Sequence, residues 1–109
     1  MVTLYGLATC DTCRKALQEI EKTGKSVEFR DVRKDPLASE QLARFVARFG
    51  DALVNRRSTT WRGLTEADRL GTVQVLIAAH PALMKRPVIE NGDVLTLGWD
   101  KSAKELHLG

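Results

Sequence analysis

Two cysteines, separated by two residues, are the side chains in this sequence most suited to chemistry. They stand at Cys10 and Cys13, in the segment Thr9-Cys-Asp-Thr-Cys-Arg14. This spacing is typical of a redox pair. The ionised form of a cysteine, the thiolate, is the nucleophile in such chemistry. A zinc site would need two further ligands, and the chain's histidines, His80 and His107, lie far apart in the sequence. We therefore expect thiol chemistry and no metal.

The elements predicted around Cys10 favour its thiolate form. A β-prone run from Val2 to Tyr5 ends at Gly6. After Cys10, apolar or small residues recur with helical spacing at Cys13, Ala16, Leu17 and Ile20. Cys10 is therefore expected at the N-terminus of a helix. There, unpaired N–H groups and the helix dipole stabilise a negative charge and lower the pKa of a thiol.

Two neighbours of Cys10 each have two open interpretations. Cys13 lies one turn into the predicted helix, where its thiol could resolve an adduct by forming a disulfide with Cys10. It also falls on the apolar face, which favours a buried core residue. Thr9 could donate a hydrogen bond to the thiolate, or the loop could simply need a small residue there. Cys10 is the predicted nucleophile under either interpretation.

Further elements follow in an α/β order. A strand over 27–32 completes a βαβ unit with parallel strands. A second helix is expected from a cap at Ser39 to a stop at Gly50. A longer helical segment is expected from Thr65 to His80. Its apolar face would consist of Leu70, Val73, Leu76 and Ile77.

The C-terminal third predicts a β-hairpin and a final helix. A strand is expected over 85–90, a tight turn at Asn91-Gly92 and a returning strand over 94–97. A short helix then turns Leu106 inward. We predict a single α/β domain over residues 1–109. Its fold class is a thioredoxin-like fold with a helical insertion and a mixed four-stranded sheet.

Composition excludes several classes of function. Charged residues make up 28% of the 109 residues, with a net charge of +3 and both signs interleaved, so nucleic-acid binding is not expected. No apolar run is long enough to span a membrane, and no secretory signal is visible. We therefore expect a cytoplasmic protein that binds neither membrane nor nucleic acid.

Four segments resemble the arsenate reductase (ArsC) family, which includes the Spx and YffB-type proteins. The matching segments are Leu4-Tyr-Gly6, Cys10-Asp-Thr-Cys-Arg-Lys-Ala16, Asn55-Arg-Arg-Ser-Thr-Thr-Trp61 and Lys85-Arg-Pro-Val-Ile89. They occur in the family's order and span nearly the whole chain. The segment from Arg57 to Trp61, followed by Leu64, is most similar to the YffB branch.

The resemblance implies roles for individual residues. In arsenate reductases of the family one cysteine attacks arsenate and arginines hold the oxyanion. Cys10 matches that cysteine, and Arg86 matches the arginine before the proline. Pro87 is expected to be a cis-proline that faces the active-site loop. Arg57 is a further candidate for binding substrate, since an arginine fork matches carboxylates and oxyanions alike. Thr9 is another candidate, because it stands beside Cys10.

Two arsenate-binding arginines of the family are not matched. One position falls near Asn55, with Arg56 and Arg57 displaced from the register, and the other falls near Leu97 and Gly98. Arsenate reduction is therefore expected to be weak. The resemblance favours a YffB-like thiol–disulfide oxidoreductase.

In that function Cys10 attacks the substrate, and glutathione or Cys13 resolves the adduct. Glutathione is the expected co-substrate, glutaredoxin is a further expected partner, and no tightly bound cofactor is expected. The chain is expected to be a monomer. Two alternatives are an arsenate reductase that uses glutathione and glutaredoxin, and an Spx-like redox-sensing regulator that binds RNA polymerase.

Overall fold

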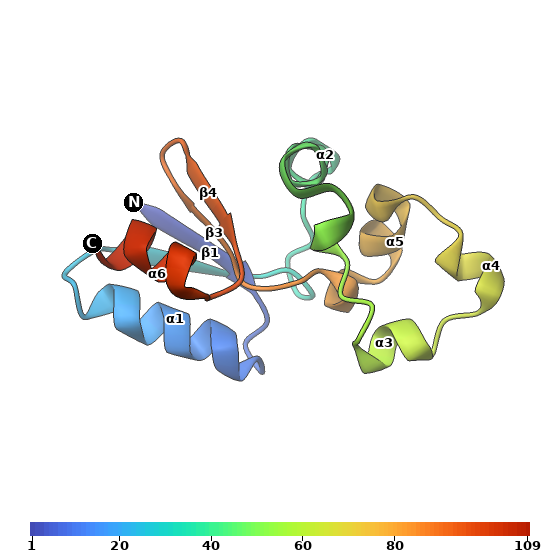
Figure 1. Cartoon of the computed structure of the whole chain (residues 1–109), viewed down its shortest axis with the longest axis horizontal. Coiled ribbons are helices and arrows are strands. Elements are labelled where there is room, and N and C mark those ends of the chain that lie inside the picture. The colour runs from blue at the N-terminus through green and yellow to red at the C-terminus, as the bar shows by residue number, and fades with distance from the viewer. The chain divides into compact units, whose positions relative to one another are not determined.

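The computed structural model describes residues 1–109 as two compact units. The first unit combines residues 1–32 with residues 86–109, and the second unit covers residues 33–85. Figure 1 shows the elements of both. The prediction of a single domain stays a prediction, and each unit is described by itself below.

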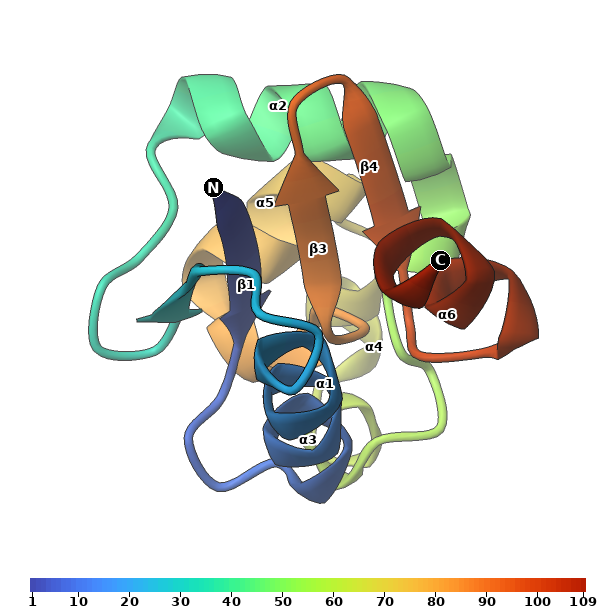
Figure 2. The same ribbon diagram turned by 90° about the vertical axis from the view of Figure 1, so that its left-hand side faces the viewer.

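The first unit is a mixed sheet with two helices. Its elements are β1 (Val2–Gly6), α1 (Asp11–Glu21), β2 (Val27–Asp31), β3 (Val88–Asn91), β4 (Val94–Leu97) and α6 (Lys101–Leu108). The strand order is β2-β1-β3-β4, with β1 parallel to β2, and with β3 antiparallel to both β1 and β4. The predicted four-stranded mixed sheet is therefore confirmed. Helix α1 contacts β1, β2 and α6, and α6 also contacts β4 (Figure 2).

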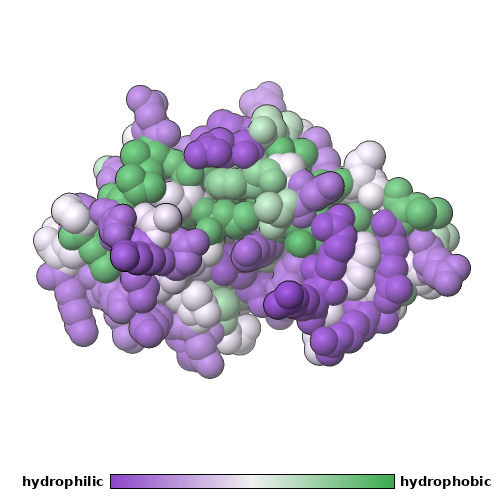
Figure 3. Space-filling model, viewed as in Figure 1, coloured by the Kyte–Doolittle hydropathy of each residue, from purple (hydrophilic) through white to green (hydrophobic).

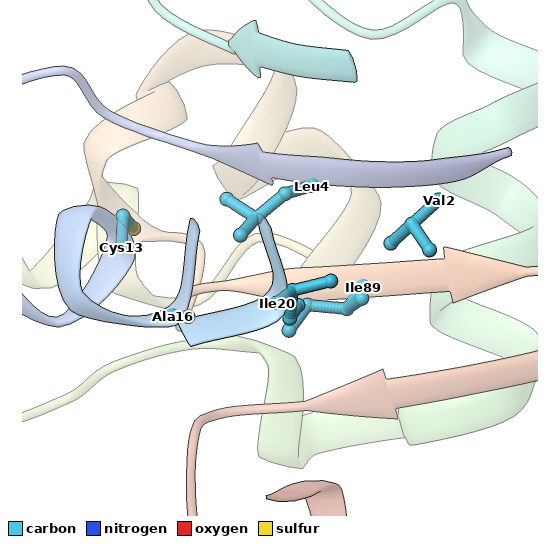
Figure 4. Packing of buried hydrophobic residues seen from close by; sticks show 6 residues of the cluster. All are labelled: Val2, Leu4, Cys13, Ala16, Ile20 and Ile89. Atoms are coloured by element: carbon cyan, nitrogen blue, oxygen red, sulfur yellow. The ribbon is translucent and has the colours of Figure 1, made fainter. Parts of the chain in front are cut away.

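The core of the first unit forms where α1 covers the sheet (Figure 4). Alternate residues of a strand point to the same face, so Val2 and Leu4 of β1 both face the helix. The buried side chains of this cluster are Val2, Leu4, Cys13, Ala16, Ile20 and Ile89. The predicted apolar face of α1 is thus confirmed, with Leu17 packed at the edge of the cluster.

Gly6 is required by the close approach of Cys13. A Cβ atom at Gly6 would lie 2.4 Å from the Sγ atom of Cys13 and 3.2 Å from its Cβ atom. Real Cβ atoms do not approach another atom to 2.4 Å. The absence of a side chain at the end of β1 therefore allows α1, and with it both cysteines, to pack against the strand.

The hairpin and the final helix differ from the prediction in register. Asn91 still pairs with Val94, so the turn consists of Gly92, at φ 59°, and Asp93. Such a turn is the kind that favours glycine at its first position. The prediction that Leu106 faces inward is wrong, because 57% of its surface is exposed.

Residues Ala103 and His107 form the buried face of α6 instead. They are four residues apart and so lie on the same face of the helix. Helix α6 begins at Lys101, because the carboxylate of Asp100 accepts a hydrogen bond from the Ala103 N–H at 2.9 Å. The imidazole Nε2 of His107 lies 2.8 Å from the hydroxyl of Thr96 on β4. Burial, followed by the charge of Lys25, lowers the pKa of His107.

The second unit is helical. Its elements are α2 (Ser39–Phe49), η1 (Gly50–Leu53), α3 (Thr59–Arg62), α4 (Glu66–Arg69), α5 (Val73–Ala79) and η2 (Pro81–Leu83). Its buried side chains include Leu42, Phe45, Leu53, Leu76, Ile77, Leu83 and Met84. An isolated antiparallel bridge between Val54 and Met84 joins the segments that follow η1 and η2.

Three predictions for the second unit are wrong. Leu70 does not belong to a buried apolar face, because 86% of its surface is exposed. Ser39 does not cap α2, because the N-cap is Ala38, whose N–H donates to the side chain of Gln41 at 3.3 Å. The segment Thr65 to His80 is not one helix. Thr65 caps α4, which ends at Arg69, and Gly71 follows as a residue of low helix propensity. Thr72 then caps α5, because its hydroxyl accepts a hydrogen bond from the Val75 N–H.

On the face that Figure 3 shows, hydrophobic residues gather in the upper middle and hydrophilic residues cover most of the lower part. None of the helices has the length and apolar character that a membrane span requires.

We expect Gly6→Ala to destabilise the protein by about 1–3 kcal/mol, because the new methyl group overlaps Cys13. The measurement is the free energy of unfolding in urea. Gly63→Ala is the matched control, since its Cβ atom would meet no atom closer than 3.6 Å. This control should change stability by less than about 0.5 kcal/mol. Equal effects of the two substitutions would contradict the packing described for Gly6.

Candidate thiol site

Cys10 is the N-cap residue of α1, as its position in the sequence predicts. Its N–H donates to the carbonyl of Leu7 at 3.0 Å, and its own carbonyl accepts from the N–H of Arg14 at 3.0 Å. One loop therefore connects β1 to the helix and holds the thiol at the helix N-terminus. Unpaired N–H groups at this end of a helix stabilise an anion.

The loop before Cys10 is also held by Asp31. The Asp31 carboxylate accepts a hydrogen bond from the Ala8 N–H at 3.0 Å. Parallel strands end at the same edge of a sheet, so Asp31 at the end of β2 lies next to the loop that follows β1. The sequence interpretation did not identify Asp31. Its position at the end of the second parallel strand is the feature of the sequence from which a contact with the loop after β1 could have been predicted.

The surroundings of Cys10 favour its ionised form. Burial by itself would raise the pKa of the Cys10 thiol. Hydrogen bonds from the backbone N–H and side chain of Cys13, together with the charge of Arg86 and a hydrogen bond from it, outweigh burial and lower the pKa. Because the thiolate is the nucleophile in disulfide exchange, the lowered pKa increases the reactive fraction at neutral pH.

Cys13 is buried and has a raised pKa, in contrast to Cys10. It is fully buried in the core cluster. Burial, together with the neighbouring Cys10 thiol, raises the pKa of Cys13 to about 12. Cys13 therefore stays a protonated thiol at neutral pH. In that form it can donate a hydrogen bond to Cys10.

Arg86 reaches the thiol because of the pairing between β1 and β3. Tyr5 pairs with Val88, so Pro87 lies level with Gly6 at the end of β1. Arg86 therefore lies next to the loop that carries Cys10. The bond between Arg86 and Pro87 is cis, which confirms that prediction.

Two further candidates from the sequence are Thr9 and Arg57. Thr9 is exposed in the loop before Cys10, and its hydrogen bond to the thiolate stays a prediction. Arg57 is an exposed residue of the second unit, where it lines a pocket of that unit. In the first unit the structure thus brings together four of the predicted residues: Cys10, Cys13, Arg86 and Pro87. No group of three or more His, Cys, Asp or Glu side chains is arranged to hold a metal ion.

Comparisons with known proteins identify relatives of this chain. The sequence model of the ArsC family matches residues 5–105. An uncharacterised protein from Haemophilus influenzae is 37% identical over 107 residues, covering 93% of each chain. The global transcriptional regulator Spx from Listeria innocua is 30% identical over 107 residues, covering 93% of this chain and 82% of Spx.

Solved structures show the same similarity. The structure of a YFFB protein has a TM-score of 0.89 at 31% identity, and the match covers 100% of both chains. An arsenate reductase (ArsC) related protein from Brucella melitensis has a TM-score of 0.74 at 35% identity, covering 97% of this chain and 92% of the other. The family resemblance and the thioredoxin-like α/β fold are therefore confirmed.

We expect Arg86→Gln to raise the pKa of Cys10, because removal of the guanidinium takes away a charge that stabilises the thiolate. The rate of alkylation by iodoacetamide, measured as a function of pH, reports this pKa. At neutral pH the rate should fall by about threefold to tenfold.

The matched control is Arg14→Gln. Arg14 is exposed and pairs with Asp11 on the surface of α1. This variant should keep the wild-type pH profile of alkylation. A profile that is unchanged in Arg86→Gln would show that Arg86 does not stabilise the thiolate.

Proposed function

Since the chain belongs to the ArsC family, we propose that it is a thiol–disulfide oxidoreductase in which Cys10 is the attacking thiolate and glutathione is the co-substrate. One observation carries the proposal. Cys10 lies at the N-terminus of α1 beside Arg86, with its pKa lowered, while the pKa of its partner Cys13 is raised. Such a difference between two neighbouring thiols selects a single nucleophile.

The proposed reaction has two exchange steps. The Cys10 thiolate attacks one sulfur of a disulfide substrate, forms a mixed disulfide with that half, and releases the other half as a thiolate. The thiolate of glutathione then attacks the substrate sulfur of the mixed disulfide. A new disulfide forms between glutathione and that half, and Cys10 leaves as a thiolate. Glutathione thus supplies the electrons, and no tightly bound cofactor takes part.

Arg86 and Pro87 would act on the substrate in this scheme. The Arg86 guanidinium stabilises the Cys10 thiolate when it attacks and again when it leaves, and it can hold an anionic group of the substrate. Pro87 follows Arg86 directly, so it borders the place where the substrate sulfur must lie. Glutaredoxin is a further proposed thiol partner.

We propose glutathione rather than Cys13 as the thiol that resolves the mixed disulfide. The Cys13 side chain is fully buried, and its pKa of about 12 leaves almost no thiolate at neutral pH. A glutathione molecule from solution meets neither obstacle. Cys13 then serves as a hydrogen-bond donor to Cys10 and as part of the core.

A second candidate function is an Spx-like redox-sensing regulator that binds RNA polymerase. The 30% identity with Spx from Listeria innocua favours it, as do two cysteines close enough to affect one another's ionisation. Capture of the C-terminal domain of the polymerase α-subunit, compared between oxidised and reduced protein, tests this candidate. Equal and negligible capture in both states would rule it out.

Substitutions at the two cysteines should have different effects on glutathione-dependent reduction of a small disulfide. Cys10→Ser removes the nucleophile and should lower kcat/KM by at least about a hundredfold. Cys13→Ser keeps a hydroxyl that can donate to Cys10, so it should retain at least about a third of the activity. The assay follows release of the thiol half of the disulfide substrate, under identical conditions for both variants.

Two results would contradict the proposal in different ways. Undiminished activity in Cys10→Ser would show that Cys10 is not the nucleophile. A Cys13→Ser variant that accumulates the Cys10 mixed disulfide and does not turn over would show that Cys13, not glutathione, resolves it. Mass spectrometry of the intact protein distinguishes that trapped adduct from the free thiol.

A further inference from the structure

The second unit contains a pocket with three cationic side chains in its lining. The pocket has a volume of about 480 Å³, within the range of roughly 300–1,000 Å³ that is usual for small-molecule sites. Its lining residues are Ala52, Val54, Asn55, Arg56, Arg57 and Lys85. No carboxylate stands among them. A hollow lined by one sign of charge concentrates the electrostatic field and attracts ions of the opposite sign.

The backbone around this cationic pocket is held by hydrogen bonds. Two chain segments run side by side at the bridge between Val54 and Met84. The N–H of Lys85 donates to the carbonyl of Leu53 at 2.7 Å, and the N–H of Asn55 donates to the carbonyl of Leu83 at 2.8 Å. These bonds keep Lys85, from one segment, beside the residues that follow Val54 in the other.

Asn55 orders the turn that carries the two arginines. Its side-chain oxygen accepts a hydrogen bond from the N–H of Arg57 at 3.0 Å. Its carbonyl accepts from the hydroxyl of Ser58 at 2.8 Å. Hydrogen bonds within the turn therefore hold the backbone that carries Arg56 and Arg57. Little further ordering is needed when a ligand binds.

Trp61 holds the side chain of Arg56. The Arg56 guanidinium carbon lies 5.3 Å from the centre of the Trp61 ring, within the range of a cation–π contact. Arg69 secures the tryptophan, because its guanidinium donates to the Trp61 carbonyl at 3.1 Å. Asp51 lies 3.8 Å from Arg56, but its side chain is 85% exposed, so water screens that pair. The charge of Arg56 thus remains available to a ligand.

We propose that this pocket binds the carboxylates of a small organic anion, and that its ligand is a peptide thiol with two carboxylates. Guanidinium forks match carboxylates in a bidentate geometry, and the lysine ammonium adds a third donor group. The apolar side chains of Ala52 and Val54 provide a surface for the ligand's aliphatic part. The naming of a peptide thiol rests on the proposed function, whereas the binding of carboxylates follows from the pocket itself.

The test is direct binding of S-methylglutathione to the full-length Cys10→Ser protein. The methylated ligand and the serine exclude disulfide exchange, so the result does not depend on whether Cys10 is the catalytic nucleophile. Calorimetry gives the dissociation constant, and ¹H–¹⁵N chemical shifts identify the residues affected. Arg56→Gln, Arg57→Gln and Lys85→Gln remove the three charges one at a time. Arg62→Gln is the matched control, an exposed arginine on α3 outside the pocket lining.

We expect saturable binding, with shift changes concentrated in the pocket lining. Each pocket substitution should raise the dissociation constant by about threefold to tenfold, and the triple variant should show no saturable binding. Arg62→Gln should bind within about twofold of the parent. The diethyl ester of S-methylglutathione, whose carboxylates are masked, should not bind. Circular dichroism of each variant establishes that it is folded.

Four results would overturn the proposal. The parent protein could fail to bind S-methylglutathione, or the three pocket variants could bind as tightly as the Arg62→Gln control. Equal binding of the diethyl ester would show that carboxylates are not recognised. Inorganic phosphate that binds more tightly than the peptide would assign the pocket to a phosphorylated ligand instead.

Discussion

The positive charge of Arg86 beside the Cys10 thiol is the interaction on which the chemistry of the first unit depends. Neither residue would be in place without the sheet. The short loop after β1 and the start of α1 position Cys10. The antiparallel pairing of β3 with β1 brings Arg86 to the same edge, although the two residues are far apart in the sequence. The order β2-β1-β3-β4 therefore assembles a reactive thiol from two distant segments.

The second cysteine makes that thiol selective. Cys10 and Cys13 are the same kind of side chain, but their surroundings shift their pKa values in opposite directions. The pKa of Cys10 is lowered and that of Cys13 is raised. Cys13 can be buried so deeply because Gly6 has no side chain. The close packing of Gly6 and Cys13 thus contributes to the raised pKa of Cys13. One thiol is reactive, and the other is part of the core.

Short-range patterns predicted the first unit well. A β-prone run and helical spacing located β1, α1 and the N-terminal position of Cys10, since these depend on neighbouring residues. The resemblance to the ArsC family added Arg86 and the cis bond at Pro87, which periodicity alone does not indicate. Asp31 was missed, because its contact with Ala8 depends on which strands are neighbours.

The errors concern positions where local signals compete. Gly71 and Thr72 divide a segment whose apolar spacing, by itself, favours one helix. Leu106 is apolar but exposed, because the start of α6 places His107 on the buried face. Arg57 was a candidate for binding substrate, but the sequence did not predict the cationic pocket that it lines. Its other charged residues, Arg56 and Lys85, come together through a bridge between distant segments that no local pattern shows.

Titration of Cys10 by NMR tests the central claim most directly. The ¹³Cβ chemical shift of selectively labelled Cys10, followed against pH, reports the ionisation of this thiol alone. The account predicts a midpoint below that of an unperturbed cysteine, about 8.5, with Cys13 still protonated throughout that transition. A midpoint for Cys10 at or above the unperturbed value, or ionisation of Cys13 before Cys10, would contradict it.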